Sequence, residues 1–568
     1  MAIKGIIYLS LLLCFLLVQA QAQSLLGDPT GRSRQERFPV PDRQPAPPPT
    51  LEATPPQPLP VTPVEHPSVT AFIKQIRIMG NTVFTDDQLS QVTNPYTNRR
   101  LTMEDIEALR MAITIFYVNQ GYINSGAVIP DQEVIDGALM IQVIEGRLSK
   151  IELEGNSLFR AGYLRDRIQP PADAPLNIHK LQERLQKLQQ DERIDTINAN
   201  LRPGAKQGDG VLDVKVKEES FFRAYLDANN YQPVSVGAEA IMLTLQHLSL
   251  TGHGDILSLG IGGSSGTWPR IETSYSLPVN RYDGTLTFEY RKNDFSVVRA
   301  VFQDLDITSK SDVYGISFRQ PVYRTVQNEI ALGLTGEYLY NKNYLDDEPF
   351  SFYPGVQDGK SVVTAIRALQ EWTYRTPRQF IALRSRLSFG IDALDATINS
   401  HNLPDSRFFS WLVQGRWSFR HQPFNMQTLV RVDAQLTPDS LLPLEQMSIG
   451  GRYTVRGYVE NQLVRDNGVS ASIETRFPVV RNKSWASILD LCAFYDFGHS
   501  WNTDFPSPKP RTLDSVGIGL RWELSRPWNS HFHPQLEFYW GIPLRTVDNE
   551  GGNVQEQGIH FRFLLMYW

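Results

Sequence analysis

The stretches Ile449-Gly-Gly-Arg-Tyr-Thr-Val-Arg-Gly-Tyr458 and Phe494-Tyr-Asp-Phe-Gly498 carry the strongest fold signal in this chain. Both lie among segments in which apolar and polar residues alternate, as they do in β-strands. Arg456 falls in a Gly-rich loop, and Asp496 falls on a strand forty positions later. An arginine in such a loop can pair with a carboxylate that points inward from the wall of a large β-barrel. If the alternating segments form a large β-barrel, Arg456 and Asp496 can pair inside it.

Period-two alternation extends from about residue 219 to Trp568. The segments are about ten residues long, and residues 515–524, 428–436 and 535–540 are the clearest examples. About sixteen segments fit, which predicts an all-β, sixteen-stranded antiparallel transmembrane barrel with a polar lumen. A soluble β-sandwich, β-helix or propeller would also alternate. Aromatic residues near the strand ends, charges on the inner face and an aromatic last residue favour the membrane barrel.

The N-terminus has the plan of an export signal. Lys4 precedes an apolar run and Ala20-Gln-Ala22 follows it, so residues 1–22 are predicted to be a signal peptide. The run is shorter than the roughly 20 apolar residues that a membrane-spanning helix needs. In the exported chain Cys492 is the only cysteine, which excludes an internal disulfide. The net charge of −6 gives no indication of a nucleic-acid partner.

Two repeat units precede the barrel, over residues 69–146 and 147–218. Ile76-Arg-Ile-Met-Gly-Asn-Thr-Val-Phe84 in the first matches Ile151-Glu-Leu-Glu-Gly-Asn-Ser-Leu-Phe159 in the second, at an offset of 75. Each unit continues with two helical patterns and two strands, which predicts α+β modules of order β-α-α-β-β.

The segments before these units are short and poor in apolar residues. Residues 23–40 form a polar N-terminal segment that contains several Arg, Gly and Pro residues. Residues 41–68 form a Pro-rich linker, which is expected to be extended and to have no core.

The repeat units resemble POTRA domains. The order of signal, N-terminal segment, linker, two units and barrel resembles that of the TpsB transporters of two-partner secretion, the ShlB/FhaC/HecB family of the BamA-like superfamily. The resemblance covers essentially the whole exported chain. It implies a protein of the bacterial outer membrane with periplasmic POTRA units and a barrel over residues 219–568. In that family the N-terminal segment can form a helix that plugs the pore, so residues 23–40 are a possible plug helix.

The resemblance also assigns roles to the two stretches quoted first. Residues 441–467 connect the predicted eleventh and twelfth strands, and in the family this loop folds back into the lumen. Arg456 is then expected to meet Asp496, since a bidentate arginine–carboxylate pair can fix a loop. The other residues of the loop and strand motifs are Gly450, Gly451, Val455, Gly457 and Tyr458, and Phe494 and Gly498. The alternative is that Arg456 is an ordinary solvated loop arginine.

No catalytic constellation emerges from the sequence. Gly262-Gly-Ser-Ser-Gly266 fits G-x-S-x-G, but a nucleophile elbow needs a strand–turn–helix context, and here strand patterns lie on both sides. His531 and His533 share a strand face without a further metal ligand nearby. Asp433, Glu474 and Glu523 are better explained as residues lining the lumen. The protein is therefore predicted not to be an enzyme and to need no metal or cofactor.

The function that the resemblance implies is the export of a large TpsA-like partner: an adhesin, a haemolysin or a contact-dependent inhibition toxin. The POTRA units would bind the unfolded partner and the barrel would conduct it. Outer-membrane lipid is the other expected contact, and a monomer is expected. Two alternatives are an outer-membrane assembly factor, which would use the seam between the first and last strands, and a passive porin or receptor.

An extended partner can bind a POTRA sheet by adding a strand to an exposed edge. The candidate edge is the middle strand of the first unit, with Tyr122, Val128 and Ile129. The alternative is that these side chains only pack in the core of that unit.

Overall fold

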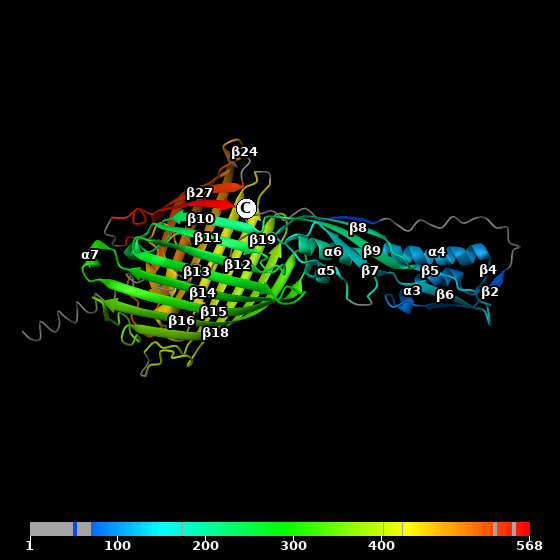
Figure 1. Cartoon of the computed structure of the whole chain (residues 1–568), viewed down its shortest axis with the longest axis horizontal. Coiled ribbons are helices and arrows are strands. Elements are labelled where there is room, and N and C mark those ends of the chain that lie inside the picture. The colour runs from blue at the N-terminus through cyan, green and yellow to red at the C-terminus, as the bar shows by residue number, and fades with distance from the viewer. Residues whose placement is uncertain are drawn as a thin grey trace, which may run out of the picture. The chain divides into compact units, whose positions relative to one another are not determined.

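A computed structural model describes residues 49–53, 70–171, 174–400, 403–422, 424–525, 531–547 and 552–568 (Figure 1). Two compact units separate at residue 219, with Ala46–Glu219 in one and Ser220–Trp568 in the other. The predicted signal peptide, the N-terminal segment and most of the Pro-rich linker lie outside the described residues. Within those residues, no helix is both long and apolar enough to cross a membrane.

The unit Ala46–Glu219 contains both repeats; the second has the predicted β-α-α-β-β order, and the first adds to it a short two-stranded sheet over Ala71–Ile73 and Arg99–Leu101. Their sheets have the orders β3-β6-β5 and β1-β8-β9-β7, and the helices of each repeat pack on one face of its sheet around its own apolar core. The first repeat consists of β2(Ala71–Ile73), β3(Gln75–Met79), α3(Asp86–Thr93), η1(Asn94–Tyr96), β4(Arg99–Leu101), α4(Met103–Asn119), β5(Gly126–Val128) and β6(Ala138–Ile144). The second consists of β7(Arg147–Glu154), α5(Ala161–Ile168), α6(Ile178–Gln189), β8(Ile194–Pro203) and β9(Asp209–Glu218).

The repeated Gly-Asn pair has a steric cause that is the same in both units. Gly80 and Gly155 end the first strand of each repeat with φ of +78° and +83°. A Cβ at Gly80 would lie 2.3 Å from the carbonyl oxygen of Val143, and one at Gly155 would lie 2.3 Å from that of Val216. Only glycine fits this contact, so the match at offset 75 reflects one chain path built twice.

A carboxylate at the C-terminal end of the last strand of each repeat holds the segment that follows the Gly-Asn pair. Glu145 accepts hydrogen bonds from the backbone N–H groups of Thr82 and Val83, at 2.7 and 3.1 Å. Glu218 does the same for residues 157–159, with distances of 2.8 Å to Ser157 N and 3.0 Å to Phe159 N. Hydrogen bonds to a charged group contribute about 1.5–3 kcal/mol each. These two glutamates were not singled out from the sequence, although they share an offset of 73.

The expectation that the Pro-rich linker is extended holds over β1(Thr50–Ala53), but the expectation that it has no core is wrong there. This strand pairs in parallel with β8, from Thr50 opposite Asn198 to Ala53 opposite Leu201, and Leu51 packs against the core of the second repeat. Residues 50–53 contain no proline and can therefore donate backbone hydrogen bonds to a free sheet edge.

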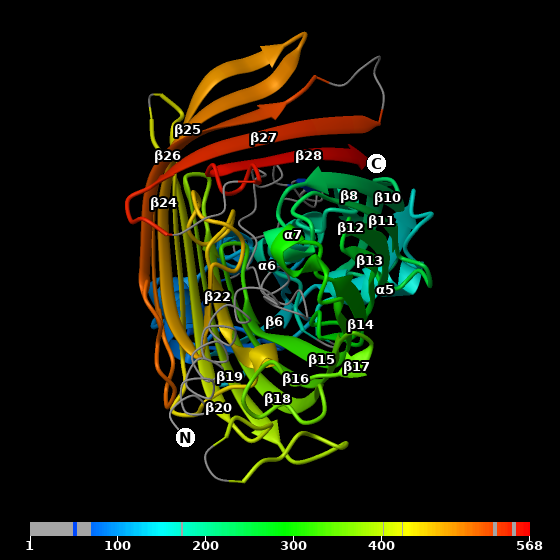
Figure 2. The same cartoon turned by 90° about the vertical axis from the view of Figure 1, so that its left-hand side faces the viewer.

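The unit Ser220–Trp568 is a closed antiparallel barrel, as predicted. Sixteen long strands and the two-residue β17(Glu348–Pro349) make up its wall within the described ranges, and β10 pairs with β28 to close it (Figure 2). The long strands are β10(Phe222–Asn229), β11(Ala240–Leu248), β12(Ile256–Ser264), β13(Thr267–Pro278), β14(Thr285–Ser296), β15(Ile307–Arg324), β16(Asn328–Leu345), β18(Lys360–Arg375), β19(Gln379–Ile391), β20(Phe409–Arg420), β21(Gln427–Leu436), β24(Asn467–Lys483), β25(Ala486–Trp501), β26(Thr512–Glu523), β27(Phe532–Pro543) and β28(Ile559–Tyr567).

Alternation in the sequence corresponds to the two faces of this wall. On β26, Val516 and Ile518 are 39% and 60% exposed on the outer face, whereas Ser515 points inward and is 0% exposed. The same contrast holds on β27, where Phe538 points outward and Glu537 inward. An apolar outer face and a polar inner face are what a barrel in a lipid bilayer requires.

Candidate functional site: a loop held inside the barrel

A long loop, residues 437–466, joins the eleventh long strand, β21, to the twelfth, β24. It lies at the end of the barrel opposite to the start of β10, because the strands alternate in direction. The loop contains η3(Pro443–Glu445) and a small hairpin of β22(Met447–Ile449) and β23(Leu463–Arg465). The tip of this hairpin carries the Arg456 motif.

Arg456 is buried against the barrel wall in a bidentate contact with Asp496 of β25. Its Nε donates to Oδ2 at 2.7 Å, its Nη2 donates to Oδ1 at 2.8 Å, and its backbone N–H donates to Oδ2 at 3.0 Å. Both side chains are 0% exposed. A buried ion pair is favourable only when its polar atoms are hydrogen-bonded. This geometry supplies those bonds and holds the loop tip at one place on the wall.

Two further groups face the same guanidinium from β24 and β25. Nη1 of Arg456 donates to Glu474, whose other oxygen accepts from Arg476 at 2.8 Å. The Arg456 guanidinium carbon lies 3.5 Å from the centre of the Phe494 ring. The β24–β25 register places Glu474 opposite Phe494, so all four groups converge. We call Arg456, Asp496, Glu474 and Phe494 the lock; from the sequence, Glu474 was expected only to line the lumen.

Glycines allow the loop backbone to touch the wall. Gly457 has φ of +95°, and a Cβ there would lie 3.0 Å from backbone atoms of Gly541 on β27. A Cβ at Gly541 would lie 2.5 Å from the backbone nitrogen of Gly457. Gly498 is required from the wall side, since a Cβ there would lie 2.4 Å from Cγ2 of Ile449.

The turn at the hairpin tip depends on two further residues of the motif. Gly450 and Gly451 have φ of +117° and +95°. The backbone N–H of Gly450 donates to Oγ1 of Thr454 at 2.8 Å, and that of Gly451 donates to the carbonyl oxygen of Val455 at 3.1 Å. Val455 is thereby turned into a small apolar cluster and is 0% exposed.

Tyr458 contacts the barrel through its hydroxyl group. The hydroxyl oxygen lies 3.0 Å from the carbonyl oxygens of both Asp514 and Arg545 and accepts from the backbone N–H of Arg545 at 3.2 Å. The ring is buried in the same apolar cluster as Val455. Tyr458 thus ties the tip to the connection that follows β27.

Two more ion pairs anchor the loop to the wall, and the sequence analysis missed both. Arg452 donates to Glu537 of β27 at 3.1 Å and lies over the ring of Tyr539 at 3.9 Å. Nearer the base of the loop, Glu445 accepts from both Nη atoms of Arg367 on β18, at 2.7 and 3.1 Å. Arg452 stands inside the quoted motif, but nothing in the local sequence distinguishes Glu445 from other loop glutamates.

The base of the loop also joins an apolar core formed by several connections at this end of the barrel. Leu441, Leu442 and Leu444 pack there, each at most 2% exposed. Their partners come from other connections and from inward-facing strand positions: Val236, Phe295, Val297, Ile307, Val313, Leu339, Phe352, Tyr353, Val356, Val363, Ala365 and Phe408. An apolar core of this size inside a polar lumen was not predicted.

The other motifs noted in the sequence do not form a site of this kind. The Gly262–Gly266 string contains the hairpin turn between β12 and β13, which end and begin at Ser264 and Thr267. His533 stacks on Trp568 at 4.1 Å, and His531 lies 5.8 Å from Tyr567. Among the described residues, no group of three or more His, Cys, Asp or Glu side chains is arranged to hold a metal ion.

The candidate POTRA edge is divided between an edge strand and the core. Val128 lies on β5, at the edge of the sheet β3-β6-β5, and pairs with Gln142. Tyr122 and Ile129 flank that strand and pack against the apolar core, where the Tyr122 ring lies 5.7 Å from that of Phe84. Of the three residues, Val128 is the one on the strand edge.

A closed sixteen-stranded barrel with an apolar outer face, preceded by POTRA units and containing a locked loop, defines an outer-membrane transporter of the BamA-like class. The chain belongs to the family of haemolysin secretion/activation proteins ShlB/FhaC/HecB, whose model matches residues 208–522. A ShlB-type POTRA domain matches residues 71–146. The protein is thus a two-partner secretion transporter of the outer membrane, with its POTRA domains in the periplasm.

Individual relatives agree with this assignment. The outer membrane transporter CdiB of Escherichia coli O6:K15:H31 is 23% identical over 70% of this chain and 67% of its own length. The heme/hemopexin transporter protein HuxB of Haemophilus influenzae is 21% identical over 79% and 80%. The structure of CdiB from Escherichia coli shares the fold with a TM-score of 0.66, at 20% identity over 97% and 98% of the chains. BamA from Haemophilus ducreyi reaches a TM-score of 0.50 at 15% identity over 87% and 99%.

Proposed function

We propose that this protein binds a large secreted partner in an unfolded state through its POTRA units and exports it through the barrel lumen. The observation that carries the proposal is the loop itself: it lies inside the barrel of a family transporter and is held against the wall by side-chain contacts such as Arg456–Asp496. The protein acts as a monomeric conduit in outer-membrane lipid and does no covalent chemistry. The partner is an adhesin, a haemolysin or a contact-dependent inhibition toxin.

The lumen wall suits an extended polypeptide of mixed sequence. Many of its charged side chains are paired with one another, as in Arg416–Asp433 at 2.7 Å and Arg319–Glu371 at 2.6 Å. A conducting pathway must bind its cargo weakly enough to release it. Where wall charges neutralise one another in this way, a passing chain meets a polar surface with a weaker net charge.

The apolar core at the far end of the barrel counts against a passive porin. Leu441, Leu442 and Leu444 pack among aromatic and aliphatic side chains of several connections. A water-filled pore for small solutes needs a polar lumen along its whole length. The assembly-factor alternative shares the barrel, but the family to which the chain belongs consists of secretion proteins.

We infer that the partner adds a strand to the POTRA sheet at β5. Within the described residues β5 is an edge, whereas β8, its counterpart in the second repeat, is already paired with β1. Edge strands bind extended peptides through main-chain hydrogen bonds. A photo-crosslinker at Val128 should capture the partner, whereas one at Arg77, on the opposite edge strand β3, should not. Equal capture at both positions would place recognition elsewhere.

The test of the proposed function is secretion of a large TpsA-like protein from the same genome, sought first among the neighbouring genes. Deleting the transporter gene should abolish appearance of that protein in the medium, while levels of unrelated outer-membrane proteins and uptake of small solutes stay unchanged. Secretion that persists after deletion contradicts the proposal. A general loss of outer-membrane proteins would support the assembly factor, and a solute-specific growth defect would support the porin.

A further inference from the structure

The pairing of β10 with β28, which we call the seam, closes the barrel over a short stretch. Its register runs from Ala224 opposite Tyr567 to Asn229 opposite Arg562. The neighbouring β27–β28 pairing is longer, from Phe532 opposite Tyr567 to Trp540 opposite Ile559. The seam therefore has fewer ladder hydrogen bonds than the pairing beside it, and other contacts must contribute more to its closure.

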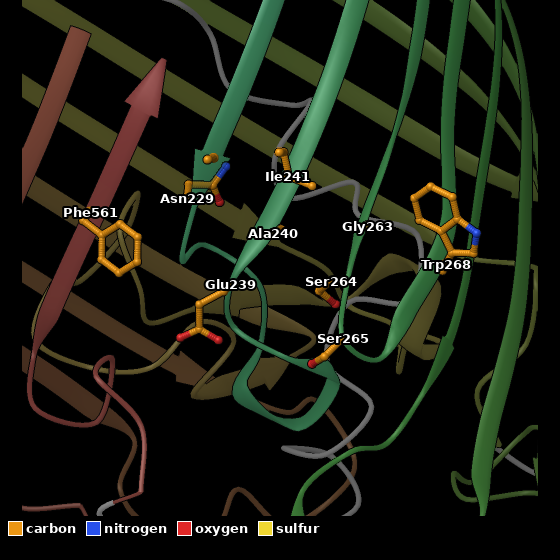
Figure 3. Close-up of a pocket in the computed structure, with 10 residues that line it drawn as sticks. Asn229, Glu239, Ala240, Ile241, Gly263, Ser264, Ser265, Trp268 and Phe561 are labelled. Carbon is orange, nitrogen blue, oxygen red and sulfur yellow. The ribbon is translucent and has the colours of Figure 1, made fainter. Parts of the chain in front are cut away.

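The wall is also hollowed on both faces at the end of the seam near the loop. Outside, a hollow of about 380 Å³ extends between Phe561 on β28 and Trp268 on β13 (Figure 3). Its floor contains Gly263 and Ala228, two of the smallest residues. Inside, a second hollow of about 400 Å³ is lined by residues of both seam strands and by Tyr453 of the loop. Apolar packing across this part of the seam is thin, and the lumen side is bridged by the ion pair of Arg562 with Asp227, at 2.7 Å.

The loop contacts both sides of the seam. On the β10 side, the Tyr453 ring lies 5.4 Å from that of Tyr231, in an edge-to-face arrangement. On the β28 side, the backbone N–H of Glu460 donates to Oε1 of Gln555 at 3.0 Å. Gly457 of the tip also approaches Gly558, whose Cβ, if present, would lie 3.4 Å from the Gly457 Cα.

Gln555 links these contacts to the first strand. Its Nε2 lies within hydrogen-bonding distance of the carbonyl oxygens of Asn230 and Gln232, which follow β10, with 2.7 Å to Gln232. Asn230 in turn donates to the carbonyl oxygen of Ile559 at 2.9 Å and accepts from the backbone N–H of Phe561 at 2.8 Å. Gln555 and Asn230 are both 0% exposed. A continuous chain of buried hydrogen bonds thus runs from the loop across the seam and back to β28.

We propose that the locked loop also holds the seam closed, and that Gln555 is the positioning residue that couples the two. Releasing the lock withdraws Tyr453 and the Glu460 N–H from the lumen side of the seam. The seam then keeps its short ladder and the Arg562–Asp227 ion pair, at 2.7 Å, and becomes the most compliant part of the wall. The reason for the loop to leave the lumen rests on the proposed function, because an exported chain that passes through the barrel must displace the loop. The coupling itself is a property of the barrel alone.

The experiment measures distances across two strand pairings in the purified full-length protein in lipid vesicles. Spin labels on Leu226→Cys and Leu565→Cys, which are in register across the seam, report on the seam. Labels on Leu243→Cys and Ile261→Cys, in register between β11 and β12, form the control pair. Both pairs are placed in a Cys492→Ala background. Opening by one strand spacing lengthens a distance by about 5 Å.

In Gln555→Leu and in Arg456→Ala, the seam pair should gain a population at distances longer by about 5 Å or more, with the control pair unchanged. The matched control variant is Gln414→Leu, which removes a buried amide from the opposite wall, where it donates to Asp433 at 2.9 Å. It should leave both pairs unchanged. A seam distance that is unaltered in Arg456→Ala, or equal broadening of both pairs, would overturn the proposal. The distance measurement contains no exported partner, so its result tests the coupling between loop and seam and does not depend on the result of the export assay.

Discussion

Replacing Arg456 with alanine should release the loop, and the structure sets the size of the effect. The substitution leaves Asp496 without its bidentate partner at 0% exposure and deprives Glu474 of one of its two arginines. Removing one partner of a buried ion pair costs about 3–5 kcal/mol. Opening the loop lets lumen water reach the carboxylates of Asp496 and Glu474. The lost ion pair therefore raises the free energy of the closed loop and not that of the open loop. The ratio of open to closed loop should rise roughly 10²- to 5 × 10³-fold.

Thiol labelling of a buried loop position measures that ratio. In a Cys492→Ala background, Val455→Cys is shielded while the loop is closed, because Val455 is 0% exposed. The labelling rate should rise at least about 100-fold with Arg456→Ala. Arg416→Ala is the matched control, since it breaks a buried pair with Asp433 that joins two wall strands and does not touch the loop. A rise of less than about fivefold with Arg456→Ala, or an equal rise with Arg416→Ala, would refute the lock.

Three further outcomes follow from local geometry. Gly457→Ala places a side chain at φ of +95°, which costs about 1–2 kcal/mol. Thiol labelling of Val455→Cys should therefore accelerate about 5- to 30-fold, less than with Arg456→Ala. An unchanged labelling rate would contradict the required close approach. Glu145→Gln and Glu218→Gln should each destabilise their own POTRA repeat by about 1–3 kcal/mol in urea unfolding, and no change would contradict their capping role. The backbone N–H of Thr102 donates a hydrogen bond to the Asp105 carboxylate and lowers its pKa. The wild type should therefore be more stable than Asp105→Asn above about pH 4, and this advantage should disappear as the pH falls through the lowered pKa. A difference independent of pH would exclude that origin.

Much of the barrel was predictable because its physical constraint repeats along the chain. Every strand must show an apolar face to lipid and a polar face to the lumen, so residues such as Ile518 and Ser515 alternate without regard to distant partners. The seam strand β28 likewise ends in aromatic residues that the sequence shows directly. The loop was recognisable for a different reason: Gly457 is required by a close approach to the backbone of β27, and Gly498 by the Ile449 side chain packed against it, which leaves a readable pattern of glycines.

The features of the structure that the sequence did not indicate depend on contacts between positions that are distant in the chain. Glu445 meets Arg367 only after the loop has entered the lumen, and Glu474 meets Arg456 only in the correct register of β24 and β25. The apolar core under the loop is assembled from several connections, each of which contributes few residues. The strand β1 was hidden because the prolines on both sides of it dominate the composition of the linker.

Transport through the lumen is tested most directly by measuring where the partner contacts the barrel during export. Thr244 lines the lumen hollow beside the loop, and Leu245, the next residue on β11, points to lipid and is 37% exposed. A photo-crosslinking residue placed at 244 should trap the secreted partner in transit, whereas the same residue at 245 should not. Adducts formed from position 245 alone, or from neither position while secretion continues, would contradict transport through the lumen.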